Sequence, residues 1–293
     1  MSTDLDLGSE DRPQSGHAAG AGQYVVKALA HGILIVASAL AVVPFAYALL
    51  TSMKPEENIF STMGQLIPAE PTLMNYVNIW MQNPLDRWIF NSLLLAAGVV
   101  FFTLLLDSLA GYALAKGDFK GQRFVYLLVV GTLIVPPQAI VVPLYIEMSQ
   151  FDLVNTYWAV MLLYIANPFG VFMMRQFFLS VPDSYLEAAR MDGCSTLQIY
   201  TRIMLPMAKP ALSSLAVFTL TFIWGAFLWP LIVLSDSSMY PLQVGLAGLT
   251  GQYGSQWGQL MAAAIIAALP VITAYLLAQK TFMEGIALTG SKG

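Results

Sequence analysis

Long and nearly uninterrupted runs of apolar residues dominate the chain, and polar residues fall between these runs rather than alternating with apolar ones. A run of roughly 20 apolar residues is long enough for an α-helix to cross the hydrocarbon core of a membrane. The sequence therefore predicts an all-α, polytopic membrane protein with six transmembrane helices. Their expected ranges are 28–50, 88–112, 124–146, 156–180, 209–234 and 257–279.

The composition agrees with this pattern and removes several classes of function. Hydrophobic residues make up 57% of the 293 residues and charged residues only 10%, whereas soluble domains carry about 25% charged residues. A soluble enzyme and a disordered chain are therefore excluded. The net charge of −4 and the lack of a basic patch argue against nucleic-acid binding. The single cysteine, Cys194, and the isolated histidines His17 and His31 indicate neither a disulfide framework nor a metal site.

Lysine and arginine are distributed unequally between the two sides of the predicted membrane segment. Only Lys54 and Arg87 fall on one side, and the other eleven of the 13 fall on the opposite side. Because cationic residues gather on the cytoplasmic side, we expect both termini in the cytoplasm. Residues 1–22 are expected to form a disordered cytoplasmic tail. The first helix and an external loop then occupy 23–87.

The most informative segment is 181–208, between the fourth and fifth helices. Asp183 is expected to be an N-cap, and the run Glu187–Arg190 has good helix propensity. Gly193 allows a turn, and apolar positions within Thr196–Met204 fall at helical spacing. These residues predict two short helices on the cytoplasmic side. Taken alone, they leave open whether the segment docks on a partner or rests on the bilayer.

The same segment resembles the EAA signature of the membrane subunits of binding-protein-dependent ABC importers. The matching residues, in order, are Glu187-Ala188-Ala189, then Gly193 after three residues, Ile203 after nine, and Leu205-Pro206 after one. The resemblance covers about 88–293, with a permease core at 88–280. It is closest to carbohydrate permeases related to the smaller membrane subunit of the maltose importer. Two further segments agree with that subfamily, Asn91-Ser92-Leu93 and the tail Phe282–Gly293.

The resemblance implies a type I ABC importer permease fold in which the segment 181–208 is a coupling helix that docks on an ATPase. In this family the motif glutamate, here Glu187, contacts a basic residue of the ATPase. The implied coupling residues are Glu187, Ala188, Ala189, Asp192, Gly193, Ile203, Leu205 and Pro206. The cytoplasmic tail, 281–293, is expected to contact the ATPase through Gly285, Thr289, Gly290 and Gly293.

The resemblance also implies the partners. We expect a multi-pass protein of the bacterial inner membrane that pairs with a second, homologous permease, with two ATPase copies and with an external binding protein. The expected substrate is a sugar, preferably a di- or oligosaccharide. A homodimer is the alternative. Small residues of the sixth helix permit close helix packing but do not decide between the two partners. No Gly-x-x-x-x-Gly-Lys-Ser/Thr pattern occurs, so we expect ATP and Mg on the ATPase and no cofactor or catalytic residue on this chain.

A few residues inside the predicted helices are candidates for the substrate pathway. Asn167 precedes a proline that interrupts the fourth helix, and Trp224 carries a ring that could stack on a sugar. Pro136-Pro137 interrupts the third helix, where a plain kink is favoured over a pathway role. Asp107 is a carboxylate within the second helix, for which a structural pairing is favoured over a pathway role. Trp229 is expected in the outer aromatic belt.

Three other functions remain open at this point. The first is import of glycerol phosphate or another polyol, because such permeases are similar in sequence. The second is a proton-coupled carrier that acts alone, for which Asp107 is weak support. The third is a membrane enzyme, which is disfavoured because no His/Asp/Glu/Ser constellation gathers on one side.

Overall fold

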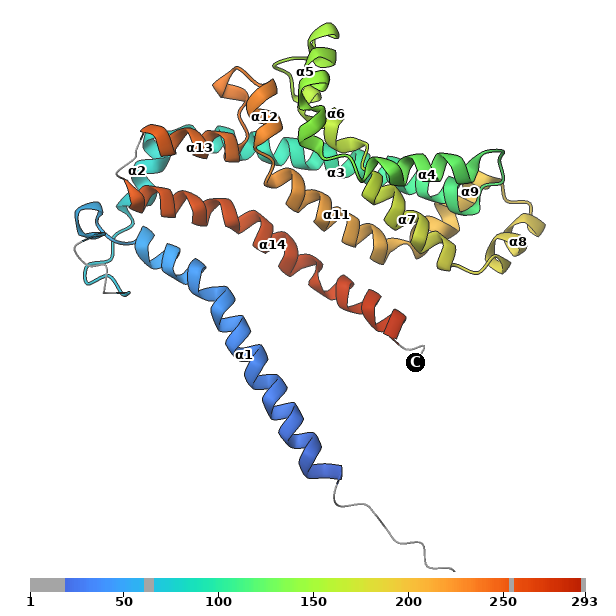
Figure 1. Ribbon diagram of the computed structural model, residues 1–293, viewed down its shortest axis with the longest axis horizontal. Coiled ribbons are helices and arrows are strands. Elements are labelled where there is room, and N and C mark those ends of the chain that lie inside the picture. Colours follow the sequence, from blue (N-terminus) through green and yellow to red (C-terminus); the bar gives the residue numbers. More distant parts are fainter. Residues whose placement is uncertain (1–18, 61–65, 253–255, 291–293) are drawn as a thin grey trace, which may run out of the picture.

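The computed structural model describes residues 19–60, 66–252 and 256–290, and in these ranges every regular element is helical (Figure 1). The all-α prediction is therefore confirmed for the described part of the chain. The longer helices are α1 (Ala19–Ser52), α3 (Leu85–Lys116), α7 (Pro168–Ser180), α11 (Lys209–Trp224) and α14 (Trp257–Gly290). The shorter ones are α2 (Met74–Gln82), α4 (Gln122–Thr132), α5 (Val141–Gln150), α6 (Tyr157–Ile165), α8 (Ser184–Met191), α9 (Thr196–Ile199), α10 (Leu205–Met207), α12 (Leu228–Val233) and α13 (Leu242–Gln252). Single turns lie at η1 (Glu56–Asn58), η2 (Pro137–Ile140), η3 (Tyr200–Met204) and η4 (Ser237–Met239).

Four stretches of the described chain are long and apolar enough to cross a membrane, and two bent helix pairs raise the number to six. The four stretches are Val26–Ser52, Leu85–Lys116, Tyr157–Ser180 and Trp257–Leu277. They overlap the first, second, fourth and sixth predicted helices. The longest of these four stretches, Leu85–Lys116, is the whole of α3. Its 32 residues extend about 48 Å, so its last turns lie beyond the roughly 30 Å hydrocarbon core.

The third predicted helix is broken rather than kinked, so the kink favoured for Pro136-Pro137 is wrong. Helix α4 ends at Thr132, and the next helical segment, Pro137–Gln150, is bent by 93° relative to α4. Two consecutive prolines remove two backbone donors, and Pro136 itself is extended, with ψ at 129°. The chain therefore changes direction here instead of continuing as one rod.

The fifth predicted helix is also interrupted, so a continuous helix over 209–234 is wrong. Helix α11 ends at Trp224, and the short α12 begins at Leu228. Pro230 has no N–H and cannot donate to the carbonyl of the preceding turn, which favours the break. Trp229, expected in the aromatic belt, is instead buried, and its indole N–H donates to the carbonyl of Ala159 at 2.9 Å.

Helix α3 is the centre of the packed part, with α6, α7 and α11 against it. The contact with α7 is close enough to require glycine. A Cβ at Gly111 of α3 would lie 2.7 Å from the Cβ of Met174 and 2.8 Å from the backbone N of Arg175. A Cβ at Gly170 of α7 would overlap the carboxylate of Asp107. These two glycines set the distance between the two helices.

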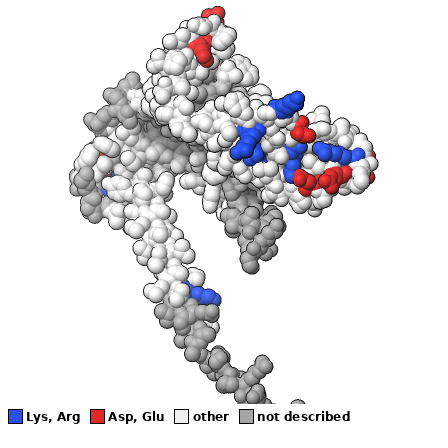
Figure 2. Space-filling model, turned by 45° about the vertical axis from the view of Figure 1, so that its right-hand side comes forward, with Lys and Arg blue, Asp and Glu red and all other residues white. Residues whose placement is uncertain are grey.

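Charged side chains gather at one end of the molecule. Figure 2 shows blue and red atoms together over the end that holds α8 and α9, while most of the remaining visible described surface is uncharged. Helix α1 contacts α14 near its C-terminal end and diverges from the other helices toward its N-terminal end, so that its apolar side chains are exposed (Figure 1). An exposed apolar helix of this length is stable in lipid or against another membrane subunit, but not in water.

Candidate functional site

Helix α8 presents one face to the protein and the opposite face to the outside. Leu186 and Ala189 are 4% and 5% exposed and join the core, whereas Glu187, Ala188 and Met191 are exposed. Met191 is 84% exposed and lies between the exposed, charged Arg190 and Asp192. Within the described residues Glu187 has no ion-pair partner. This face combines an unpaired carboxylate, a small residue and a large apolar side chain, which suits docking on another protein.

A tight turn ends α8 and starts the next helix. Gly193 has a φ of +82°, which residues with a Cβ rarely adopt. The N–H of Gly193 donates to Arg190, and the N–H of Cys194 donates to Ala189. Ser195 then forms a capping box with Gln198 at the start of α9. The two short helices predicted from the sequence are therefore present, joined at Gly193.

The second of these helices is wider than an ordinary α-helix. The backbone N–H of Leu205 donates to Tyr200, five residues earlier, so that Tyr200–Met204 forms a π turn. Pro206 follows in α10, and the chain bends by 75° between Thr196–Met207 and α11. Ile203 and Leu205 are half-buried in this turn, and Pro206 is exposed.

An aromatic cluster joins these short helices to the long ones. Tyr200 contacts Tyr112 of α3 with ring centroids 5.3 Å apart, and Tyr112 contacts Phe178 of α7 at 5.6 Å. The hydroxyl of Tyr200 also shares a 2.7 Å hydrogen bond with Ser108. Met204 is fully buried in the same cluster. A close-packed contact of this kind transmits displacement, because packed side chains cannot be compressed.

Lys116, at the end of α3, fixes the start of the segment. Its ammonium donates to the carbonyl of Val181 at 2.7 Å and forms an ion pair with Asp183. The Lys116 side chain is 7% exposed and that of Asp183 is 74% exposed. Asp183 does occupy the predicted N-cap position, but its side chain makes no cap hydrogen bond because it pairs with Lys116 instead.

Lys116→Met is expected to loosen this attachment and lower the free energy of unfolding by about 1.5–3 kcal/mol, the range for a hydrogen bond to a charged group. Asp183→Asn is expected to cost less than about 1 kcal/mol, because the exposed partner contributes little. Thermal unfolding midpoints of the two variants in detergent check the difference. Equal midpoints for both variants would mean that Lys116 does not anchor the segment.

The eight predicted coupling residues all lie within 187–206, and the structure divides them by exposure. Glu187, Ala188, Asp192, Gly193 and Pro206 are exposed, whereas Ala189 is buried. The predicted tail residues Gly285, Thr289 and Gly290 lie within helix α14, and Gly293 lies outside the described residues. Residues 1–18 of the predicted disordered tail also lie outside them, whereas residues 19–22 begin helix α1, so the predicted end of that tail at residue 22 is wrong.

Asn167 and Asp107 meet at the break between α6 and α7. Asn167 is the N-cap of α7, and its side-chain oxygen accepts from the N–H of Phe169. The carboxylate of Asp107 lies against Gly170 in the first turn of α7, and its buried Oδ2 has no hydrogen-bond partner within the described residues. Thr103, one turn earlier in α3, lies 3.5 Å from the carbonyls of Tyr164 and Ile165. Thr103 therefore meets carbonyls that the break leaves free, and the structural role favoured for Asp107 stays a prediction.

Trp224 lies against α14 rather than in an open space. Its side chain is 3% exposed, and its indole N–H donates to the carbonyl of Ala267 at 2.9 Å. This position gives the end of α11 a fixed contact. Stacking of Trp224 on a sugar remains a prediction.

Lys116, Ser108, Tyr200 and Met191 are the residues of this site that sequence reasoning missed. Lys116 entered only as a charge that sets orientation. The contacts of Ser108 and Tyr200 join residues 92 positions apart, which no local pattern reveals. Met191 did carry a usable signal, since it follows Ala188 by three positions in a short helix and so shares its face.

Comparison with known proteins identifies the family. Residues 107–284 match the family described as binding-protein-dependent transport system inner membrane component. The arabinooligosaccharides transport system permease protein AraQ of Halalkalibacterium halodurans is 37% identical over 257 residues, covering 87% of this chain and 92% of that protein. The diacetylchitobiose uptake system permease protein NgcG of Streptomyces coelicolor is 30% identical, covering 86% and 85%.

A more distant relative and one solved structure complete the comparison. The sn-glycerol-3-phosphate transport system permease protein UgpE of Yersinia enterocolitica is 28% identical, covering 87% of this chain and 94% of that one. A chain of a bacterial ABC transporter for import of alginate superposes with a TM-score of 0.78 at 22% identity, covering 90% and 98%. At that identity the superposition supports the fold, which is that of an ABC importer permease.

Proposed function

This chain belongs to the family of inner-membrane components of binding-protein-dependent transport systems, and from that premise we propose that it is a permease of an ATP-driven importer for a di- or oligosaccharide. The observation that carries the proposal is the exposed face of α8, which combines the EAA spacing with an unpaired Glu187. That face has the composition of a docking site, and the aromatic cluster beneath it connects it to the membrane helices.

The coupling mechanism follows from this arrangement. When two ATPase subunits close on ATP, each carries its docked coupling helix with it. Displacement of α8 and α9 reaches α3 through the contact between Tyr200 and Tyr112, and reaches α7 through Phe178. The permease then exchanges between inward-facing and outward-facing states, whose relative populations ATP binding shifts.

The proposed substrate class rests on the relatives. Proteins named for arabinooligosaccharides and diacetylchitobiose are 37% and 30% identical to this chain, and the one named for glycerol 3-phosphate is 28% identical. An oligosaccharide is therefore favoured, and glycerol phosphate or another polyol is the second candidate. A proton-coupled carrier is disfavoured, because residues 107–284 match a family of binding-protein-dependent transport components, and such components act together with a binding protein rather than alone.

The partners follow from the same assignment. One chain supplies one coupling segment, so a second permease is needed for two ATPase subunits, and we favour a homologous but different permease. ATP and Mg are assigned to the ATPase subunits, and this chain takes no catalytic part. The C-terminal part of α14 and the residues after it are assigned a second contact with the ATPase. An external binding protein delivers the sugar.

Reconstitution in proteoliposomes tests the proposal. The chain would be co-expressed with the permease, ATPase and binding protein encoded beside it, and uptake of radiolabelled arabino-oligosaccharides would be measured. Uptake is expected to require both internal ATP and the binding protein. Uptake driven by a proton gradient without ATP would contradict the proposal. ATP-dependent uptake of glycerol 3-phosphate, with no uptake of sugar, would replace the substrate class and leave the importer assignment standing.

A further inference from the structure

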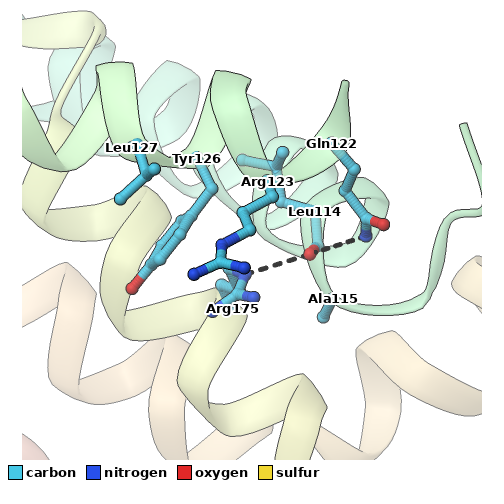
Figure 3. A pocket seen from close by; sticks show the side chains of 7 residues that line it. All are labelled: Leu114, Ala115, Gln122, Arg123, Tyr126, Leu127 and Arg175. Carbon is cyan, nitrogen blue, oxygen red and sulfur yellow. Dashed lines mark hydrogen bonds between the residues drawn. The ribbon is translucent and has the colours of Figure 1, made fainter. Parts of the chain in front are cut away.

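A pocket of about 480 Å³ lies where the end of α3, the start of α4 and the middle of α7 meet, separate from the exposed face of α8. Figure 3 shows Arg123 and Arg175 entering this space from α4 and α7, beside the ring of Tyr126. The remaining lining residues are Leu114, Ala115, Gln122 and Leu127. None of these residues takes part in the proposed coupling mechanism.

Arg175 is held in place by contacts that leave its outer nitrogens available. Its Nε donates to the carbonyl of Leu114 at 3.0 Å, and its guanidinium carbon lies 3.7 Å from the centre of the Tyr126 ring. The hydroxyl of Tyr126 accepts from Gln176 at 3.3 Å, which fixes the ring. Gln122 also donates to the Leu114 carbonyl, at 2.9 Å. The guanidinium is thus oriented toward the pocket before any ligand arrives.

Two cations share the pocket without an acidic partner. Among the described residues no carboxylate lies within ion-pair distance of Arg123 or Arg175. Lys116, on the same end of α3, is already occupied by Asp183. Two guanidinium groups without a carboxylate repel each other, and an anion between them relieves the repulsion. Planar guanidinium groups match the oxygens of a phosphate, which they bind with two parallel hydrogen bonds.

The surroundings of the pocket indicate where that phosphate comes from. The outward face of α4 is apolar and exposed, with Phe124, Leu127 and Leu128 at 66%, 56% and 56%. This face begins beside Arg123, so acyl chains could lie along it while a headgroup occupies the pocket. Basic pockets between membrane helices on the cytoplasmic side are typical sites for anionic lipid headgroups.

We infer that Arg123 and Arg175 bind the phosphodiester of an anionic phospholipid of the cytoplasmic leaflet. The inference rests on the proposed function in one respect, namely that this end of the molecule faces the cytoplasm. The pocket lies next to Lys116, which holds the start of the coupling segment. A bound lipid would therefore brace the ends of α3, α4 and α7 at the point where the coupling segment joins them.

Native mass spectrometry of the full chain in detergent, titrated with phosphatidylglycerol and with phosphatidylcholine, tests the site without ATP or sugar. The wild-type chain is expected to retain phosphatidylglycerol in preference to phosphatidylcholine. Arg123→Gln is expected to weaken retention of phosphatidylglycerol about fivefold, the effect of one cation near an anionic lipid surface. Arg123 is exposed and forms no ion pair within the described residues, so this variant should fold normally.

Lys209→Gln is the matched control, because it removes one exposed cation from the same end of the molecule but outside the pocket. Its retention of phosphatidylglycerol should equal that of the wild type. Equal retention of both lipids, or an equal loss in both variants, would overturn the inference. Displacement of phosphatidylglycerol by millimolar inorganic phosphate would also overturn it, in favour of a soluble phosphate ligand. Loss of sugar uptake in the proteoliposome assay would leave this result unaffected, so the two proposals fail separately.

Discussion

Glu187→Ala is expected to reduce ATP-driven uptake at least tenfold and to prevent co-purification of the ATPase. The carboxylate lies on the exposed face of α8 and has no ion-pair partner within the described residues. Removal of one partner of a buried charge pair across an interface typically weakens the free energy of binding by about 2–5 kcal/mol. The expected loss therefore lies in association with the ATPase, measured by pull-down and by uptake in proteoliposomes.

Asp118→Asn is the control for Glu187→Ala. Asp118 is an exposed acid of the loop between α3 and α4, at the same end of the molecule and outside the coupling segment. The Asp118→Asn variant should match the wild type in uptake and in ATPase association. The unfolding midpoints of the Asp118→Asn and Glu187→Ala variants should both be unchanged. Wild-type uptake by the Glu187 variant, at equal expression, would show that this residue does not couple the permease to the ATPase.

Gly170→Ala is expected to lower the free energy of unfolding by about 1–3 kcal/mol, the usual cost of an extra methyl in a packed core. The new Cβ would overlap the carboxylate of Asp107 and would lie 3.1 Å from Leu215. Asp107, which is 1% exposed, would have to move within this packed interior. Yield from membranes and the unfolding midpoint in detergent check this result.

A second substitution separates this explanation from a general sensitivity of the glycines. Asp107→Ala removes the obstructing side chain, so Gly170→Ala combined with Asp107→Ala should recover part of the lost stability relative to Gly170→Ala alone. Gly111→Ala offers no such rescue, because its Cβ would meet the backbone N of Arg175 as well as Met174. If adding Asp107→Ala makes Gly170→Ala less stable still, the overlap at Gly170 is not the cause.

Apolar run length and the EAA spacing were enough to predict much of this fold and site. The runs that became α1, α3 and α14 are long and contain few helix breakers, so their positions followed from hydrophobicity alone. The coupling segment was predictable because the helix propensity of Glu187–Arg190, the turn at Gly193 and the apolar spacing within Thr196–Met204 act locally. Such local signals depend on a few neighbouring residues and survive in the sequence.

The burial of the two tryptophans and the contacts beneath the coupling segment depend on residues far apart in the chain. Trp224, the last residue of α11, is buried and donates its indole N–H to the carbonyl of Ala267. Trp229 is also buried, and its indole N–H donates to the carbonyl of Ala159. A tryptophan with a partner of this kind cannot be told from a lipid-facing one by its neighbours in sequence. The ion pair of Lys116 with Asp183 was hidden for the same reason.

Cross-linking from the exposed face of α8 tests the central claim most directly. The native Cys194 would be replaced by serine, and Ala188→Cys would then carry the only thiol of the permease, on the exposed face of α8. In membranes that contain the assembled transporter, a short cross-linker with a maleimide at one end and an amine-reactive ester at the other is expected to join this thiol to an amine of the ATPase subunit. A membrane-impermeant maleimide added from outside intact cells should leave the thiol unlabelled. Labelling from outside, with no cross-link to the ATPase, would contradict the account.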